Sequence, residues 1–194
     1  MKANFRRFFS LTLIIVSFFA SFFVTQKYLN QRLLESKKTL GAQTQNDGQT
    51  FPVRLLIPKI NVNVVIESVG VTSKGNMATP KNTDNAGWFS LGPRPGETGS
   101  AVIAGHFDNI DGNPSIFANL SQLTAGDKLY IQDNRGEFKT FTVSSSKLFN
   151  PGYANSVFAP SDKAYLNLVT CEGVWDPDTK SYSKRLVVFS DLAT

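Results

Sequence analysis

The sequence predicts one mostly-β domain, closed or nearly closed into a barrel, preceded by a single N-terminal transmembrane helix. From residue 51 onward, short runs rich in Val, Ile and Phe alternate with Gly, Pro and Asn-Asp turns, which is typical of β-strands. Before residue 25, an uncharged apolar run has the length of a short membrane span. Many short strands without long helices favour a barrel over an α/β sheet.

The apolar run covers residues 8–24, where only Ser and Thr interrupt the hydrophobic side chains. Lys2, Arg6 and Arg7 precede it within residues 1–7, so we expect a cytoplasmic basic tail and an extracellular C-terminal domain. A cleavable signal peptide is the alternative. No convincing small-x-small cleavage site follows Val24, so we expect an uncleaved single-pass signal-anchor in the cell membrane.

Residues 25–50 are polar and rich in Gln, Thr, Lys and Gly, which predicts a stalk between the membrane and the domain at 51–194. The chain has a formal net charge of +5, but the surplus lies before residue 51, and the domain itself is balanced. Nucleic-acid binding needs positive charge clustered on the domain, so we exclude it as a function.

Alternating apolar runs predict seven strands within the domain, at 53–57, 62–66, 100–104, 128–132, 138–144, 164–171 and 185–190. A short helix is predicted over 115–123, because apolar residues recur there at helical spacing after Pro114. Pro and Gly clusters predict loops at 93–96 and 111–114.

The chain contains one histidine, His106, and one cysteine, Cys171. A lone cysteine excludes an internal disulfide and a multi-cysteine zinc site. His106 and Cys171 each end a predicted strand, and Arg185 begins the last one. Taken singly, each residue is more often structural: a satisfied histidine, a buried cysteine or a surface charge. Their shared position at strand ends is where a rigid scaffold holds working groups.

Acyl transfer through a thioester would use all three residues. The thiolate of Cys171 is the nucleophile, and an imidazole promotes its attack or protonates the leaving amine. The oxyanion that develops needs donors, which the Arg185 guanidinium offers. Thr170 could add a backbone or hydroxyl donor, and the chemistry requires no metal or cofactor. Because neighbouring strand residues face opposite sides, only one of Lys184 and Arg185 can face Cys171.

The order His106, then Leu168-Val169-Thr170-Cys171, then Arg185 resembles the sortases of Gram-positive and related bacteria. Their hallmark is a TLxTC-type segment, and this chain departs from it at Asn167, which stands where the first Thr is expected. The segments 86–89, 95–96 and 104–106 are also similar to the region around the sortase histidine. The resemblance covers residues 53–192.

The resemblance implies an eight-stranded β-barrel and a cysteine transpeptidase with His106, Cys171 and Arg185 as catalytic residues. Such an enzyme cleaves an LPxTG-like sorting signal between Thr and Gly, and transfers the acyl group to an amine on a cell-wall precursor or pilin. The run from Thr170 to Gly173 and the Arg-Leu-Val-Val-Phe ending are most similar to class F or the related D and E groups. Some sortases depend on calcium, but no calcium ligands can be matched here residue by residue.

Two interpretations stay open beside the core motif. Asp108 lies two residues after His106 and either orients the imidazole, as carboxylates do in triads, or is a solvated turn acid, which we favour. Trp88 and Phe89 either line a peptide groove or belong to the core, which we favour. Residues 72–85 could partly cover the site.

Other function classes fit less well. L,D-transpeptidases place a His shortly before the Cys and an Arg two residues after it, whereas position 173 here is Gly and no second His exists. Papain-like hydrolases carry Cys before His in the chain. A membrane-tethered, non-enzymatic β-domain that binds wall polymer or protein stays open, as does a sortase-like hydrolase that releases its substrate.

Overall fold

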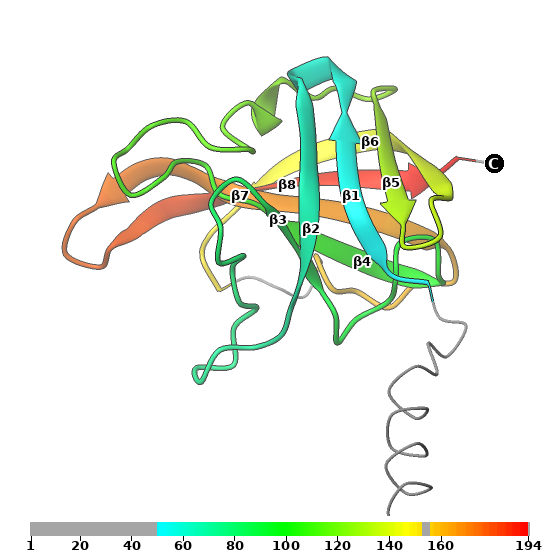
Figure 1. The fold of residues 1–194 in the computed structure, drawn as a ribbon. Helices are drawn as coiled ribbons and strands as arrows, with labels where there is room; N and C mark the ends of the chain where they lie inside the picture. Colours follow the sequence, from blue (N-terminus) through cyan, green and yellow to red (C-terminus); the bar gives the residue numbers. More distant parts are fainter. Residues whose placement is uncertain (1–49, 153–155, 194) are drawn as a thin grey trace, which may run out of the picture. The chain divides into compact units, whose positions relative to one another are not determined.

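The computed structural model describes residues 50–152 and 156–193. Its eight strands close into a barrel in the order β1-β2-β3-β4-β7-β8-β6-β5 (Figure 1), which confirms the predicted mostly-β fold. The strands are β1 (Pro52–Ile57), β2 (Val62–Val69), β3 (Ala86–Phe89), β4 (Gly99–Ala104), β5 (Lys128–Asp133), β6 (Phe138–Phe149), β7 (Ala164–Asp176) and β8 (Ser181–Leu192). Two short 3-10 helices, η1 (Pro58–Ile60) and η2 (Leu120–Gln122), complete the described elements.

All seven predicted strands are present, and β7 and β8 extend well beyond their predicted ends, to 13 and 12 residues. The eighth strand, β3, was not predicted, because it has only four residues and follows a long irregular segment. It pairs in parallel with β2 and antiparallel with β4, and so closes the barrel on that side.

Of the short helix predicted over 115–123, the structure forms only η2. The amides of Ala118, Leu120, Gln122 and Leu123 each donate to the carbonyl three residues earlier, as in tight turns. Phe117, Leu120 and Leu123 are all buried, and their spacing of three residues suits such turns. The apolar period that predicted an α-helix therefore belongs to a chain of tight turns that packs onto the barrel core.

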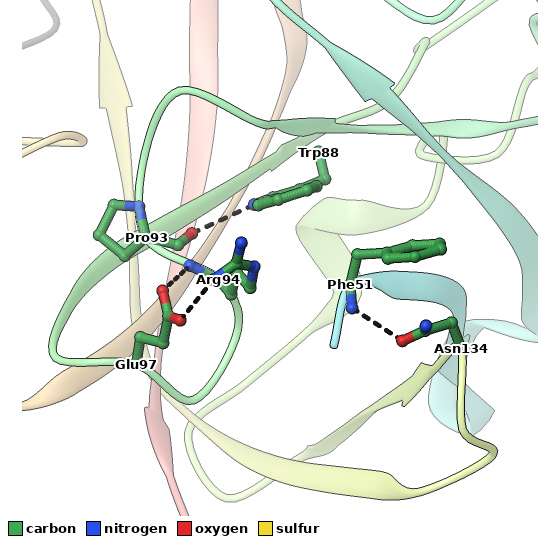
Figure 2. Close-up of polar contacts among 6 residues, drawn as sticks. All are labelled: Phe51, Trp88, Pro93, Arg94, Glu97 and Asn134. Atoms are coloured by element: carbon green, nitrogen blue, oxygen red, sulfur yellow. Dashed lines mark hydrogen bonds and ion pairs between the residues drawn. The ribbon is translucent and has the colours of Figure 1, made fainter. Parts of the chain in front are cut away.

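Alternate residues of the strands fill the barrel interior, as the pleat of a strand requires. Leu55, Leu129 and Leu168 are completely buried in this core. Trp88 also belongs to it, with 5% of its surface exposed, and its indole N–H donates to the carbonyl of Pro93 at 3.1 Å (Figure 2). Trp88 is therefore a core residue, as favoured from the sequence.

The wall formed by β4, β7 and β8 is apolar on both faces. Ile103, Leu168 and Val188 lie in the interior cluster, whereas their neighbours Val102 and Val187 belong to a second buried cluster. That second cluster also contains Phe149 and Val157, and Met77, Phe89, Val169 and Phe189 pack against it. A strand that is buried on both sides loses the simple apolar–polar alternation. The second face of this wall becomes the floor of the groove described below.

Polar contacts fasten the beginning of the domain. The amide of Phe51 donates to the side chain of Asn134 at 2.9 Å (Figure 2). The amide of Asn134 donates back to the carbonyl of Phe51. In the loop after β3, Arg94 forms an ion pair with Glu97 at 3.0 Å (Figure 2). The barrel therefore begins at a fixed point beside the β5–β6 turn.

Among residues 50–152 and 156–193, no helix combines the length and the hydrophobicity needed to cross a membrane. The predicted span at 8–24, the basic tail at 1–7 and all but the last residue of the stalk at 25–50 lie outside the described residues.

Candidate active site

Two parallel neighbours in the barrel wall, β4 and β7, bring His106 and Cys171 together. Ala104 pairs with Val169, and just beyond that pair the amide of Gly105 donates to the carbonyl of Val169 at 3.0 Å. His106 and Cys171 each lie two residues beyond this pair, and the two strands run in the same direction. The one histidine and the one cysteine of the chain therefore lie at the same end of the wall.

The antiparallel register of β7 and β8 pairs Cys171 with Arg185, and Glu172 with Lys184. Directly opposed residues on neighbouring strands carry their side chains on the same face. Lys184 instead donates from its ammonium to the side chain of Asn150 at 2.7 Å. The register thus selects Arg185, not Lys184, as the cationic neighbour of the thiol.

A groove of about 790 Å³ runs over this end of the wall, and all four predicted site residues line it. Polar residues of the lining also include Lys74, Asn76, Thr79, Asn150, Lys180 and Ser181. Val102, Phe149, Val157 and Val187 of the second cluster line it too, with Met77 and Val169, which pack against that cluster, and with Phe158. The site is therefore an open groove of mixed polar and apolar lining that contains the thiol.

His106 has two contacts with backbone groups of other segments, one through its own carbonyl and one through its imidazole. Its carbonyl accepts a hydrogen bond from the amide of Phe117 at 3.0 Å, and its Nε2 lies 3.3 Å from the carbonyl oxygen of Pro80. Nε2 must carry the hydrogen when this contact is a hydrogen bond, since a carbonyl only accepts. The contact therefore favours the tautomer with hydrogen on Nε2 and leaves Nδ1 as an acceptor.

The segment that carries Pro80 also forms a wall of the groove, through residues 74 and 76–79. Its C-terminal side is held by the carboxylate of Glu67 on β2, which accepts from the amide of Lys81 at 3.1 Å and from the side chain of Asn85 at 2.8 Å. These bonds lower the pKa of Glu67, the Asn85 bond most strongly. The expectation that residues 72–85 partly cover the site agrees with this placement.

Thr170 is buried, and its hydroxyl donates to the carbonyl of Gly105 at 2.9 Å. That bond ties the cysteine-bearing strand to the histidine-bearing chain. The hydroxyl hydrogen is thereby used within the scaffold, so the hydroxyl is not the oxyanion donor considered from the sequence. The backbone amide of Thr170 remains a predicted donor to the oxyanion.

Asn167, the departure from the sortase-type motif, has a structural role. Its side chain is buried, and its amide nitrogen donates to the carbonyl of Val157 at 2.7 Å. Val157 lies in the groove wall. Asn167 therefore fastens the segment after β6 to β7 through its side-chain amide, a group that Thr lacks.

Asp108 has a different partner from either interpretation of the sequence. Its carboxylate accepts a hydrogen bond from the phenol of Tyr182 on β8. The favoured solvated turn acid is therefore wrong, because the carboxylate joins two segments of the structure. Tyr182 was not singled out from the sequence. The available signal was its position on the last strand, three residues before Arg185.

The Sortase domain family model matches residues 55–193, most of the chain. The chain belongs to the sortase family. It is 31% identical over 94 residues to sortase A of Bacillus anthracis, a match that covers 48% of this chain and 40% of that protein. The chain thus matches less than half the length of this relative.

Solved structures of other sortases share the fold. Sortase A from Corynebacterium diphtheriae superposes with a TM-score of 0.60 at 23% identity, over 74% of this chain and 61% of that one. Sortase C-1 from Actinomyces oris also gives a TM-score of 0.60 at 22% identity, over 80% and 81% of the two chains. These likenesses establish the sortase barrel and go no further.

In this sortase domain the reactive sulfur is a half-buried free thiol. Burial raises the pKa of Cys171 above its ordinary value, the Arg185 charge acts in the opposite direction, and the Asp108 charge adds to the increase. Cys171 therefore rests as the neutral thiol near pH 7, and its proton must leave before or during attack on a substrate.

The Arg185 guanidinium is held from three directions. Nη1 donates to the carbonyls of Tyr182 and Lys184, at 2.9 and 2.8 Å, and Nη2 donates to the hydroxyl of Ser181 at 3.0 Å. A guanidinium has more N–H groups than these bonds use, so it retains donors for a bound group. Within residues 50–152 and 156–193, no cluster of three or more His, Cys, Asp and Glu side chains could hold a metal ion.

Proposed function

We propose that this sortase domain is a cysteine transpeptidase that cleaves an LPxTG-like sorting signal through a thioester on Cys171. The acyl group then passes to an amine on a cell-wall precursor or a pilin. The observation that supports this most directly is the groove itself, since one open groove with an apolar floor holds the thiol, the imidazole of His106 and the guanidinium that is paired with the thiol.

The groove suits an extended peptide with apolar residues before its scissile bond. Val102, Val169 and Val187 come from three neighbouring strands and give the groove a continuous apolar floor. Leu and Pro side chains would bury apolar surface there, while the following polar residues would reach the end occupied by Cys171 and His106. The segment around Val157 would close the side of the channel.

The proposed reaction has two acyl transfers. The sulfur of Cys171 attacks the carbonyl carbon of the scissile Thr–Gly bond as its proton passes to the imidazole of His106, and the oxyanion that develops is stabilised by donors of Arg185. The imidazole of His106 delivers a proton to the departing amine as the C–N bond breaks. The acceptor amine then attacks the thioester, forms a new amide, and returns the thiol of Cys171.

We extend the proposal to the N-terminal part of the chain. Residues 8–24 would act as the single-pass anchor, with residues 1–7 in the cytoplasm and the catalytic domain outside the cell. This rests on the charge-free apolar run and on the basic residues before it. The only cysteine, Cys171, gives a direct topology test. A membrane-impermeant maleimide should label intact cells that carry the wild-type chain and should leave cells with Cys171→Ala unlabelled.

The enzymatic proposal is tested with the full-length chain in detergent and a quenched LPxTG peptide, with and without an oligoglycine or a lysine-bearing peptide. We expect cleavage that needs Cys171 and a product joined to the amine, identified by mass. Release of the free acid alone, even with amine present, would instead indicate a hydrolase. If no peptide of a sorting-signal panel is cut and Cys171 resists alkylation, a non-enzymatic binding domain would replace the proposal.

A further inference from the structure

We propose that Tyr182 is a positioning residue that fixes the histidine-bearing loop and Arg185 relative to each other. The inference rests on the transpeptidase function proposed above, because it concerns the geometry of that site. It follows from two contacts of a single residue, one through the backbone and one through the side chain.

The backbone of Tyr182 holds the arginine. Its carbonyl accepts a hydrogen bond from Nη1 of Arg185 at 2.9 Å, while the Ser181 hydroxyl accepts one from Nη2. The guanidinium is therefore oriented by residues at the beginning of its own strand. Any shift of Tyr182 would move the donors that the proposed mechanism assigns to the oxyanion.

The side chain of Tyr182 holds the loop after β4. The phenol donates to Asp108, two residues after His106, and the ring packs edge-on against Phe107 with centroids 5.5 Å apart. Phe107 is the direct neighbour of His106 in sequence. On its other contact the ring packs against Trp175 of β7, with centroids 5.2 Å apart. Three segments of the chain thus meet on one tyrosine ring.

These segments need such a link because they lie beyond the barrel. The ends of β7 and β8 form a hairpin that extends past the other strands, beside the loop that follows β4 (Figure 1). Their tips are open to solvent, with Val174 75% exposed and Ile110 98% exposed. Barrel packing therefore does not fix the tips of the hairpin and of the loop, and the contacts of Tyr182 join the hairpin to the loop.

The phenol of Tyr182 stays protonated at and above neutral pH. The Asp108 carboxylate raises the pKa of Tyr182 to about 12, so the phenol keeps its hydrogen far above neutral pH. The side chains whose charge acts on this phenol are Asp108 from the loop after β4, which is its hydrogen-bond partner, and Cys171 from β7. Arg185 contacts the backbone carbonyl of Tyr182. Tyr182 is therefore a fixed donor and not a titrating switch.

The test compares Tyr182→Phe with Tyr130→Phe, a matched change on β5, in the full-length chain. Tyr182→Phe removes only the phenolic oxygen and keeps the ring contacts. We expect kcat to fall at least about tenfold with KM nearly unchanged, because the substrate groove stays intact while the catalytic groups lose their alignment. Tyr130→Phe should leave kcat at the wild-type value.

Because His106 is the only histidine, its ring gives one set of NMR signals that reports on its position. We expect Tyr182→Phe to shift or broaden these signals, and Asp108→Asn, whose side-chain oxygen still accepts the hydrogen bond, to perturb them less. Wild-type kcat together with unchanged His106 signals in Tyr182→Phe would overturn the inference. An inactive wild-type chain would instead contradict the proposed function, and the NMR comparison would still decide whether Tyr182 holds the loop.

Discussion

Cys171 on β7 and Arg185 on β8 are directly opposed partners in an antiparallel ladder. This register places a permanent positive charge beside a half-buried thiol. The guanidinium is fixed by two backbone carbonyls and a hydroxyl. Its orientation therefore depends on the strand and does not require a bound substrate.

Replacing Arg185 by Lys tests whether the guanidinium geometry matters beyond its charge. An ammonium on a flexible stem cannot reproduce the fork that bonds Tyr182 and Lys184. We expect Arg185→Lys and Arg185→Ala both to lower kcat, the Ala variant by on the order of 10²–10³-fold. The matched change Lys184→Ala should keep the wild-type rate, as measured by peptide cleavage. If Arg185→Lys and Arg185→Ala cleaved the peptide as fast as Lys184→Ala and the wild type, Arg185 would have no part in the mechanism.

The pH dependence of thiol alkylation reports the charges around Cys171. Burial raises the pKa of the thiol, so the alkylation rate should still be rising at pH values where an ordinary cysteine has levelled off. Asp108→Asn removes a negative charge that raises this pKa, so the profile should move to lower pH. Arg185→Ala removes a positive charge that lowers it, so the profile should move to higher pH. Shifts of the opposite sign would contradict the arrangement of charges.

Gly105, the residue before His106, has no room for a side chain. A Cβ there would overlap the ring of Phe117 and the side chain of Ile116. We expect Gly105→Ala to destabilise the domain by about 1–3 kcal/mol, measured by chemical denaturation, and to slow catalysis by displacing His106. Gly70→Ala is the control, because a Cβ at that position meets nothing within 4 Å. Similar unfolding midpoints for both variants would be inconsistent with the packing described.

The hydroxyl of Thr170 joins the two strands that carry the catalytic groups. Thr170→Val keeps the shape of the side chain but leaves the carbonyl of Gly105 without its buried donor, which costs about 1–3 kcal/mol. We expect lower stability and lower activity in this variant, whereas Thr170→Ser keeps the hydroxyl and should recover much of both. Thermal unfolding and peptide cleavage measure the two effects. If Thr170→Val behaved like the wild type, the hydroxyl would have no part in aligning the strands.

Short-range sequence patterns predicted much of the fold. Short runs rich in Val, Ile and Phe between Gly, Pro and Asn-Asp turns located seven strands, including the strands of the wall that are buried on both faces. The pattern failed at β3, which is too short to show a period, and at 115–123, where buried residues follow a spacing of three through tight turns. The predicted end of β7 came too early and the predicted start of β8 too late, since both strands continue beyond the core as an exposed hairpin.

The residues of the site were predictable, but their places on the strands were only partly so. His106 follows the end of β4 as expected, whereas Cys171 and Arg185 lie within β7 and β8, which continue to Asp176 and begin at Ser181. The structure nevertheless brings all three to a single groove. The choice between Lys184 and Arg185 depends on the β7–β8 register, which alternation alone does not supply. The pairing of Asp108 with Tyr182 depends on the length of the hairpin and on the path of an irregular loop. Neither has a sequence period, so this contact was visible only in three dimensions.

The most direct test of the account is to trap the acyl-enzyme. Full-length chain is mixed with an excess of LPxTG peptide without amine, quenched in acid and analysed by intact and peptide mass spectrometry. The account predicts an added mass equal to the peptide up to its Thr residue, located on Cys171, released by hydroxylamine and absent in Cys171→Ala. Cleavage of the peptide by Cys171→Ala at the wild-type rate, or an acyl adduct on a different residue, would contradict it.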